Sequence, residues 1–118
     1  MKYTIYHNPR CHKSRCALDW LTKKQLDVTV IDYIKTGITL KQLKQISESL
    51  GLAPQNWVRK EEAEYKTHVK GKTLTDEELF ALMVRFPKLI QRPIVQWANQ
   101  AVIARPIELL FDALTDAD

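Results

Sequence analysis

Hydrophobic and polar residues follow one another at the start of the chain in a pattern that predicts a strand, a helix and a second strand. Residues 3–6 are β-branched or aromatic, and the His-Asn-Pro sequence at 7–9 is typical of a turn. From Ser14 onward the apolar residues recur at helical spacing as far as Lys23 and Lys24. Residues 28–31 form a second apolar run. Short connections between these elements favour a parallel βαβ unit.

The middle of the chain carries two signals for helix starts. Residues 39–42 read Thr-x-x-Gln, a capping box, and the apolar stripe that follows ends at Gly51, where a helix commonly stops. Residues 75–78 read Thr-x-x-Glu and predict a second helix that Pro87 ends. The polar residues 59–65 indicate a loop or a short helix.

The last third of the chain predicts a hairpin and a final helix. Residues 94–97 and 101–104 are apolar runs around a short turn, and Pro106 suits the first position of a helix whose apolar residues continue to Leu114. The order of elements is βαβ, several helices, then ββα. This order matches an α/β fold with a thioredoxin-like mixed sheet, and Pro93, directly before the third strand, stands where a cis proline is expected.

Length and composition narrow the classes of protein. The chain has 118 residues, of which 45% are hydrophobic, enough for one domain with its own core. We therefore expect one thioredoxin-like domain over residues 1–118, with a helical insertion at approximately 39–90. The net charge of +4 is spread along the chain, which favours a small anion as ligand and argues against nucleic acid. Without a signal peptide or a long apolar run, we expect no membrane association and a cytoplasmic location.

Two cysteines provide the candidate chemistry. In a reducing compartment Cys11 and Cys16 are expected to be catalytic or simply buried rather than bridged. Cys11 lies at the predicted start of the first helix, where unpaired N–H groups and the helix dipole favour an anion. The nearby basic residues would lower its pKa from ~8.5 toward ~3.5–7.5 and make it a nucleophile at neutral pH. These residues are His7, Arg10, Lys13 and Arg15.

Cys16 falls inside the same predicted helix. A thiol in the core or on the helix surface is the simpler interpretation, and a disulfide with Cys11 would need the two Cα atoms within ~7 Å. The cysteines and the scattered histidines 7, 12 and 68 lack the ligand spacing of a zinc site, so no metal is expected.

The segment His7-Asn8-Pro9-Arg10-Cys11-His12-Lys13-Ser14-Arg15 resembles the arsenate reductase family that works with glutathione and glutaredoxin, whose hallmark is Tyr-His-Asn-Pro-x-Cys-x-x-Ser-Arg on a thioredoxin-like fold. Later landmarks agree with this family and extend the resemblance over essentially the whole chain. They are Arg59-Lys60, Gln91-Arg92-Pro93-Ile94-Val95 and Arg105-Pro106.

The resemblance implies roles for individual residues. Cys11 would attack arsenate, and Arg59, Arg92 and Arg105 would hold the oxyanion. Planar, permanently charged guanidinium groups are well suited to a tetrahedral anion with several acceptor oxygens.

Two further residues are implied as supports of the thiolate. His7 would act through its charge or a hydrogen bond, and Ser14 as a hydroxyl donor to the sulfur or the substrate. Each residue also has a simpler interpretation: Ser14 caps the first helix, or His7 packs at the end of the first strand.

The resulting hypothesis is an enzyme of arsenic detoxification that reduces arsenate to arsenite. Cys11 forms an adduct with arsenic, glutathione attacks it as co-substrate, and glutaredoxin resolves the mixed species. No bound cofactor and a monomer are expected. A redox-sensing regulator resembling Spx, which binds RNA polymerase, is an alternative, although that branch has a Cys-x-x-Cys pair. A glutathione-dependent thiol reductase of another substrate and a Cys11–Cys16 disulfide mechanism also stay open.

Overall fold

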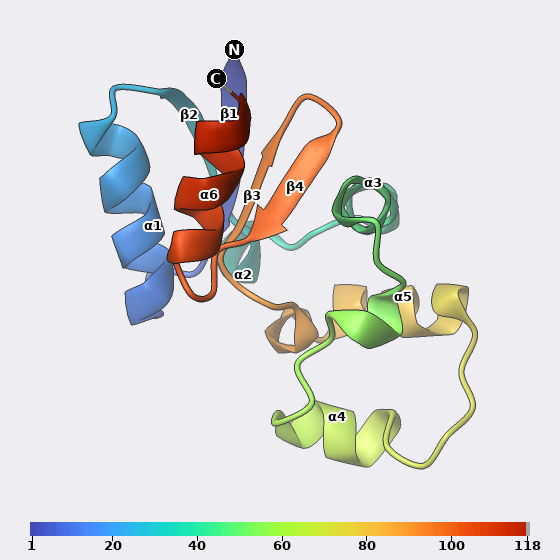
Figure 1. Cartoon of the computed structure of the whole chain (residues 1–118). Helices are drawn as coiled ribbons and strands as arrows, with labels where there is room; N and C mark the ends of the chain where they lie inside the picture. The colour runs from blue at the N-terminus through green and yellow to red at the C-terminus, as the bar shows by residue number, and fades with distance from the viewer. Residues whose placement is uncertain (118) are drawn as a thin grey trace. The chain divides into compact units, whose positions relative to one another are not determined.

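A computed structural model describes the backbone of residues 1–117 and the side chains of residues 1–114 (Figure 1). The chain forms two compact units. The first, called the α/β unit here, consists of Met1–Thr36 and Arg92–Asp118, and the second, the helical unit, is Gly37–Gln91. Within the described residues, no helix has the length and apolar composition that crossing a membrane requires.

The α/β unit is built on a four-stranded mixed sheet of order β2-β1-β3-β4. Strands β1 and β2 are parallel, while β1–β3 and β3–β4 are antiparallel, so the predicted βαβ unit and the hairpin are both confirmed. The strands are β1 Lys2–His7, β2 Asp27–Asp32, β3 Ile94–Trp97 and β4 Gln100–Ile103. The helices of this unit are α1 His12–Lys23, α2 Tyr33–Thr36 and α6 Glu108–Ala117.

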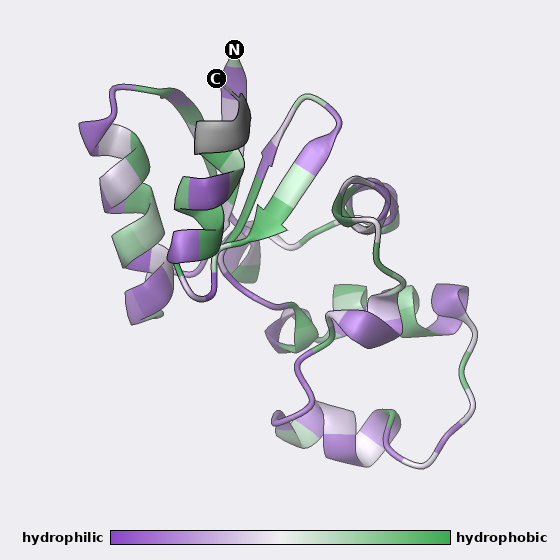
Figure 2. Cartoon of the chain, in the orientation of Figure 1, coloured by the Kyte–Doolittle hydropathy of each residue, from purple (hydrophilic) through white to green (hydrophobic). Residues whose placement is uncertain are grey.

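The core of the α/β unit lies between the sheet and the pair α1 and α6, which lie side by side (Figure 1). The rings of Trp20 and Phe111 join the two helices at a centroid distance of 4.8 Å. Hydrophobic and hydrophilic residues alternate along both helices, as Figure 2 shows, and this spacing buries one side of each helix. Members of this core include Ile5, Ala17, Leu21, Val95 and Leu110.

The entry to α6 differs from the expectation. The prediction that Pro106 stands at the first helical position is wrong, because α6 begins at Glu108. Leu109 and Leu110 donate their N–H groups to carbonyls only three residues back, so the chain makes a turn before it becomes an α-helix. The Arg92–Pro93 peptide bond is cis, as predicted, and the Arg105–Pro106 bond is cis as well.

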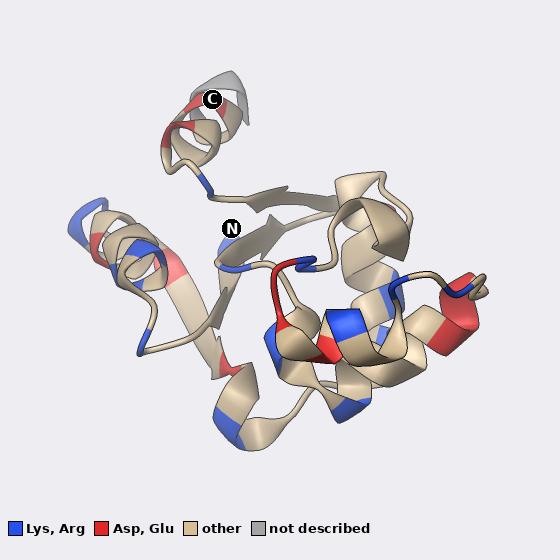
Figure 3. Ribbon diagram, turned by 90° about the horizontal axis from the view of Figure 1, so that it is seen from below, with Lys and Arg blue, Asp and Glu red and all other residues tan. Residues whose placement is uncertain are grey.

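The helical unit confirms both capping boxes. At the start of α3 (Leu40–Leu50) the Thr39 hydroxyl accepts the N–H of Gln42 at 3.1 Å, and the helix ends at Gly51 with a φ of 69°, which glycine adopts without strain. Helix α5 (Asp76–Arg85) starts with the same cap arrangement. Charged residues of both signs are spread over the chain (Figure 3). The elements of this unit are α3 Leu40–Leu50, η1 Pro54–Asn56, α4 Ala63–His68, α5 Asp76–Arg85 and η2 Pro87–Leu89.

Candidate active site

Cys11 lies in the turn that connects β1 to α1. Its N–H donates to the carbonyl of Asn8 at 2.9 Å, and the side-chain oxygen of Asn8 accepts the N–H of Arg10 at 3.0 Å. Cys11 has extended backbone angles and is the N-cap residue of α1, with its carbonyl accepting the N–H of Arg15 at 3.0 Å. The side chain therefore leaves the chain at the positive end of the helix, as predicted.

The surroundings of Cys11 lower the pKa of its thiol below the ordinary value. Partial burial acts in the opposite direction, but the N–H of Ser14, the side chain of Arg92 and the N–H of Lys13 together outweigh it. The sulfur makes no capping hydrogen bond of standard geometry, so these groups act mainly as positive charge directed at it. The direction of the shift is as predicted, but its causes are Arg92 and N–H groups of the first helical turn rather than the side-chain charges of residues 7, 10, 13 and 15.

His7 and Ser14 form a buried pair beneath this turn. The Nδ1 atom of His7 lies 2.6 Å from the Ser14 hydroxyl, which also accepts the N–H of Asn8 at 3.0 Å. Burial lowers the pKa of His7, with the charge of Asp32 opposing and that of Arg15 adding to the effect, which favours a neutral ring. The serine hydroxyl can then donate its own hydrogen to Nδ1.

This pair fixes the turn rather than the end of the helix. Ser14 is fully buried, and the N-cap position of α1 belongs to Cys11, so the Ser14 side chain does not cap the helix. The implied direct support of the thiolate by His7 and Ser14 stays a prediction.

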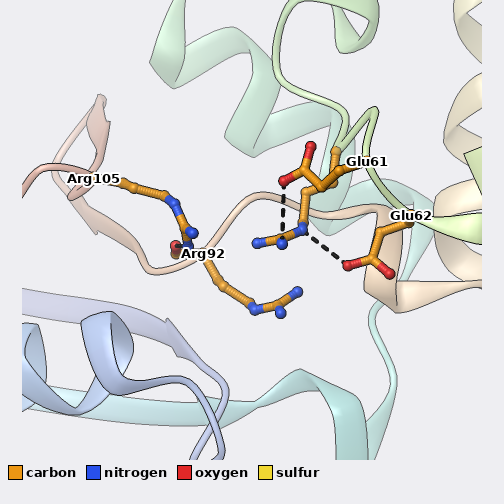
Figure 4. Close-up of polar contacts among 5 residues, drawn as sticks. Glu61, Glu62, Arg92 and Arg105 are labelled. Carbon is orange, nitrogen blue, oxygen red and sulfur yellow. Dashed lines mark hydrogen bonds and ion pairs between the residues drawn. The ribbon is translucent and has the colours of Figure 1, made fainter.

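Arg92 and Arg105 contact each other within the α/β unit. Arg105 donates from Nη1 to the backbone carbonyl of Arg92 at 3.3 Å, as Figure 4 shows. The Arg92 side chain lies near Cys11 and lowers the pKa of its thiol, whereas its Nε and Nη1 atoms are buried without a partner among the described residues. The α/β unit thus brings together the thiol and one predicted arginine, and places the second at the backbone of the first.

Arg59 belongs to the helical unit and has acidic partners. Its Nη2 atom lies 3.2 Å from Glu61 and its Nε atom 3.2 Å from Glu62, contacts drawn as dashed lines in Figure 4. The residue is only 7% exposed. The two glutamates were not predicted as site residues, although carboxylates two and three positions after an arginine are a signal that could have indicated them. The role of Arg59 in holding the oxyanion stays a prediction.

Cys16 lies on α1 with partial exposure, and its sulfur is 3.4 Å from Nε2 of His12, one helical turn earlier. Both cysteines are free thiols. Among residues 1–114, no group of three or more His, Cys, Asp or Glu side chains is arranged to hold a metal ion.

The sheet order and the lowered pKa of the cysteine at the start of α1 define the class: a thioredoxin-like α/β protein with a thiol of lowered pKa between the first strand and the first helix. The chain matches the ArsC family over residues 6–110 and belongs to this arsenate reductase family. The family and the fold predicted from the sequence are both confirmed.

Individual relatives agree with this assignment. The chain is 33% identical to an arsenate reductase of Escherichia coli over 115 residues, which are 97% of this chain and 82% of that protein. It is 36% identical to an arsenate reductase of Neisseria meningitidis over 106 residues, 88% of this chain and 91% of that protein. Its fold is similar to an arsenate reductase structure from Vibrio cholerae, with a TM-score of 0.87, 39% identity and coverage of 94% and 97% of the two chains.

Proposed function

We propose that this protein reduces arsenate to arsenite, with Cys11 as nucleophile, glutathione as co-substrate and glutaredoxin as the partner that regenerates the thiol. The observation that carries the proposal is the lowered pKa of Cys11 at the N-terminus of α1 in a chain of the ArsC family. A thiolate, not a thiol, attacks an electrophilic centre.

The reaction balances with two thiols for each arsenate. The Cys11 sulfur forms a bond to arsenic(V), and an arsenate oxygen leaves as water after taking up protons. The glutathione sulfur then attacks the Cys11 sulfur of the adduct and forms an S–S bond. The sulfur–arsenic bond breaks, its two electrons remain on arsenic, and arsenite departs. Cys11 and glutathione are left as a mixed disulfide, and a glutaredoxin thiol takes over the glutathione and frees Cys11.

The arginines have a separate task in this reaction. Arg92 faces the sulfur and has two buried nitrogen atoms without partners, so it can stabilise the thiolate first and an arsenate oxygen afterwards. Arg105 holds the carbonyl of Arg92 and would contribute its remaining N–H groups. Arg59, which the family resemblance implies, would complete the set. Lysine could supply charge at these positions but not the bidentate geometry.

The direct test is an assay of arsenate-dependent NADPH consumption with glutathione, glutathione reductase and glutaredoxin. The intact chain is expected to turn over, and Cys11→Ser to lose at least about 10³-fold in rate, as expected for a covalent nucleophile. Cys16→Ser is the matched control, since it removes the other thiol. Absence of arsenate turnover by the intact chain, or activity retained by Cys11→Ser, would refute the proposal.

The same control separates two mechanisms. In the glutathione mechanism Cys16→Ser keeps most of its activity, because Cys16 takes no part in the reaction. In a Cys11–Cys16 disulfide mechanism Cys16→Ser is inactive, and mild oxidation lowers the mass of the intact chain by two hydrogen atoms.

A further inference from the structure

Two of the three guanidinium nitrogens of Arg59 have carboxylate partners, and the third has no hydrogen-bond partner among the described residues. Glu62 accepts a hydrogen bond from Nε at 3.2 Å, and the Glu61 carboxylate forms an ion pair with Nη2 at 3.2 Å. The Nη1 atom is buried and has no hydrogen-bond partner among the described residues. Arginine cannot lose its charge in a protein, so a buried, unpartnered N–H end of this kind is suited to an anion.

The backbone on both sides of this pair is fixed. The N–H of Arg59 donates to the carbonyl of Leu89 at 2.8 Å, next to the bridge between Val58 and Ile90. Glu62 is the N-cap residue of α4, and its carbonyl accepts the N–H of Tyr65 at 3.1 Å. The Arg59 side chain is thus held at its backbone and at Nε, which leaves little freedom for the Nη1 end.

The two glutamates differ in exposure. The Glu62 side chain is 22% exposed and the Glu61 side chain 60%, while the Arg59 side chain they share is 9% exposed. Exposed ion pairs contribute little because water screens them and the side chains lose entropy, whereas a partly buried pair is screened less. Glu62 is therefore the partner that can fix the arginine.

We propose that Glu62 is a positioning residue for oxyanion binding: it holds Arg59 by Nε so that the Nη1 and Nη2 edge is presented to a tetrahedral oxyanion. Glu61 is a solvent-facing partner with little effect. The inference rests on the proposed function, since it takes the oxyanion held by Arg59 to be the substrate. Two oxygens of such an anion match the geometry of the Nη1 and Nη2 nitrogens, of which Nη1 is unpartnered among the described residues.

Calorimetric titration of the full chain with arsenate, without glutathione, tests this inference. Glu62→Ala is expected to weaken arsenate binding about 10-fold or more, as loss of a positioning contact does. Glu62→Gln keeps an oxygen acceptor for Nε and is expected to stay within about threefold of the intact chain, because the geometry is retained. The matched control Glu61→Ala is expected to stay within about twofold, since its pair is exposed.

A second variant keeps the inference testable if the Glu62→Ala chain does not fold. Glu62→Asp keeps the charge but withdraws the carboxylate by one methylene, so it is expected to weaken arsenate binding as Glu62→Ala does. In the coupled assay both variants are expected to raise KM for arsenate with a smaller change in kcat, which a general loss of stability would not produce.

The outcomes separate this inference from the proposed function. If Glu62→Asp binds arsenate as the intact chain does, or if Glu61→Ala loses as much affinity as Glu62→Ala, Glu62 does not position Arg59, and arsenate reduction is unaffected as a proposal. If the affinities follow the expected order but no arsenate is reduced, the positioning role stands and the proposed reaction fails. An intact, folded chain that binds no arsenate overturns the positioning role.

Discussion

Two arginines predicted for the same task have opposite surroundings in the two units. Arg92, in the α/β unit, lies near the Cys11 thiol and forms no ion pair with any carboxylate of the described residues. Arg59, in the helical unit, is paired with Glu61 and Glu62. The first arginine keeps its positive charge available for a neighbouring anion, and the second has its charge partly compensated. Family motifs therefore identify both residues but do not distinguish a group that supplies charge from a group that is held in position.

The first prediction concerns the uncompensated arginine. Arg92→Gln is expected to lower kcat/KM for arsenate by about 10²–10³-fold, the range for removing one charged donor from a developing anion. Arg59→Gln is expected to lose less, because two carboxylates already reduce the potential at that guanidinium. The measurement is the coupled NADPH assay on both variants. Equal losses would show that the contrast between the two arginines has no functional meaning.

The second prediction is a pH dependence of thiol reactivity. Since the native pKa of Cys11 is lowered, alkylation by iodoacetamide should reach its plateau at a lower pH than for an ordinary thiol, and it should slow as the pH falls through the native pKa. Arg92→Gln is expected to move the midpoint upward, because the thiolate loses a cationic partner. Arg59→Gln should leave the midpoint in place, as the groups that lower this pKa belong to the α/β unit.

The same ionisation affects stability, with a defined sign. The native thiolate stabilises the folded chain at pH values above the pKa of the unfolded thiol, and this contribution disappears as the pH falls through the lower native pKa. Cys11→Ala should show a smaller decrease in the free energy of unfolding across that interval. A decrease as large as that of the intact chain would assign the pH dependence to other groups.

The third prediction tests the core of the α/β unit. Leu110 is fully buried in the cluster between α6 and the sheet, so Leu110→Ala is expected to cost about 2–5 kcal/mol of unfolding free energy. Leu109→Ala is the matched control, because the neighbouring Leu109 is 45% exposed. Urea denaturation of both variants measures the difference. A cost for Leu109→Ala as large as that for Leu110→Ala would contradict the described burial of α6.

The fold was predictable wherever apolar spacing or cap chemistry was strong. Strand β1, helix α1 and the capping boxes of α3 and α5 follow from local patterns, which tertiary contacts merely reinforce. The start of α6 was misplaced because a proline that suits a first helical turn equally suits a turn before the helix. The short helix α2 and the 3₁₀ turn η2 were not predicted, because a single turn is too short to show a periodic spacing of apolar residues.

The candidate site was predictable to the extent that it is local. Cys11 follows from its place between a strand and a helix, and its lowered pKa from the N–H groups of the first turn. The partner of Ser14 was not predictable: a hydroxyl three residues after the cysteine can face the sulfur or the interior, and here it bonds to His7. The spacing of Glu61 and Glu62 from Arg59 makes them candidates, but the stretch is polar and most charges in such a stretch are solvated, so the spacing alone does not show that these two are paired.

The last and smallest effect concerns the helical unit, whose helix α5 depends on its cap. The Thr75 hydroxyl accepts the N–H of Glu78 at 3.1 Å, and the Glu78 carboxylate accepts the N–H of Thr75 at 3.0 Å. The N–H of Thr75 and, to a smaller extent, its side chain lower the pKa of Glu78. Thr75→Ala removes half of this arrangement and is expected to cost about 1 kcal/mol. The exposed Thr73, two residues earlier and outside the box, provides the control Thr73→Ala, which should stay within about 0.5 kcal/mol of the intact chain. Because the carboxylate of Glu78 is favoured by its bonds, the cost of Thr75→Ala should shrink as the pH falls through the native pKa of Glu78, and an undiminished cost in acid would contradict the reciprocal cap.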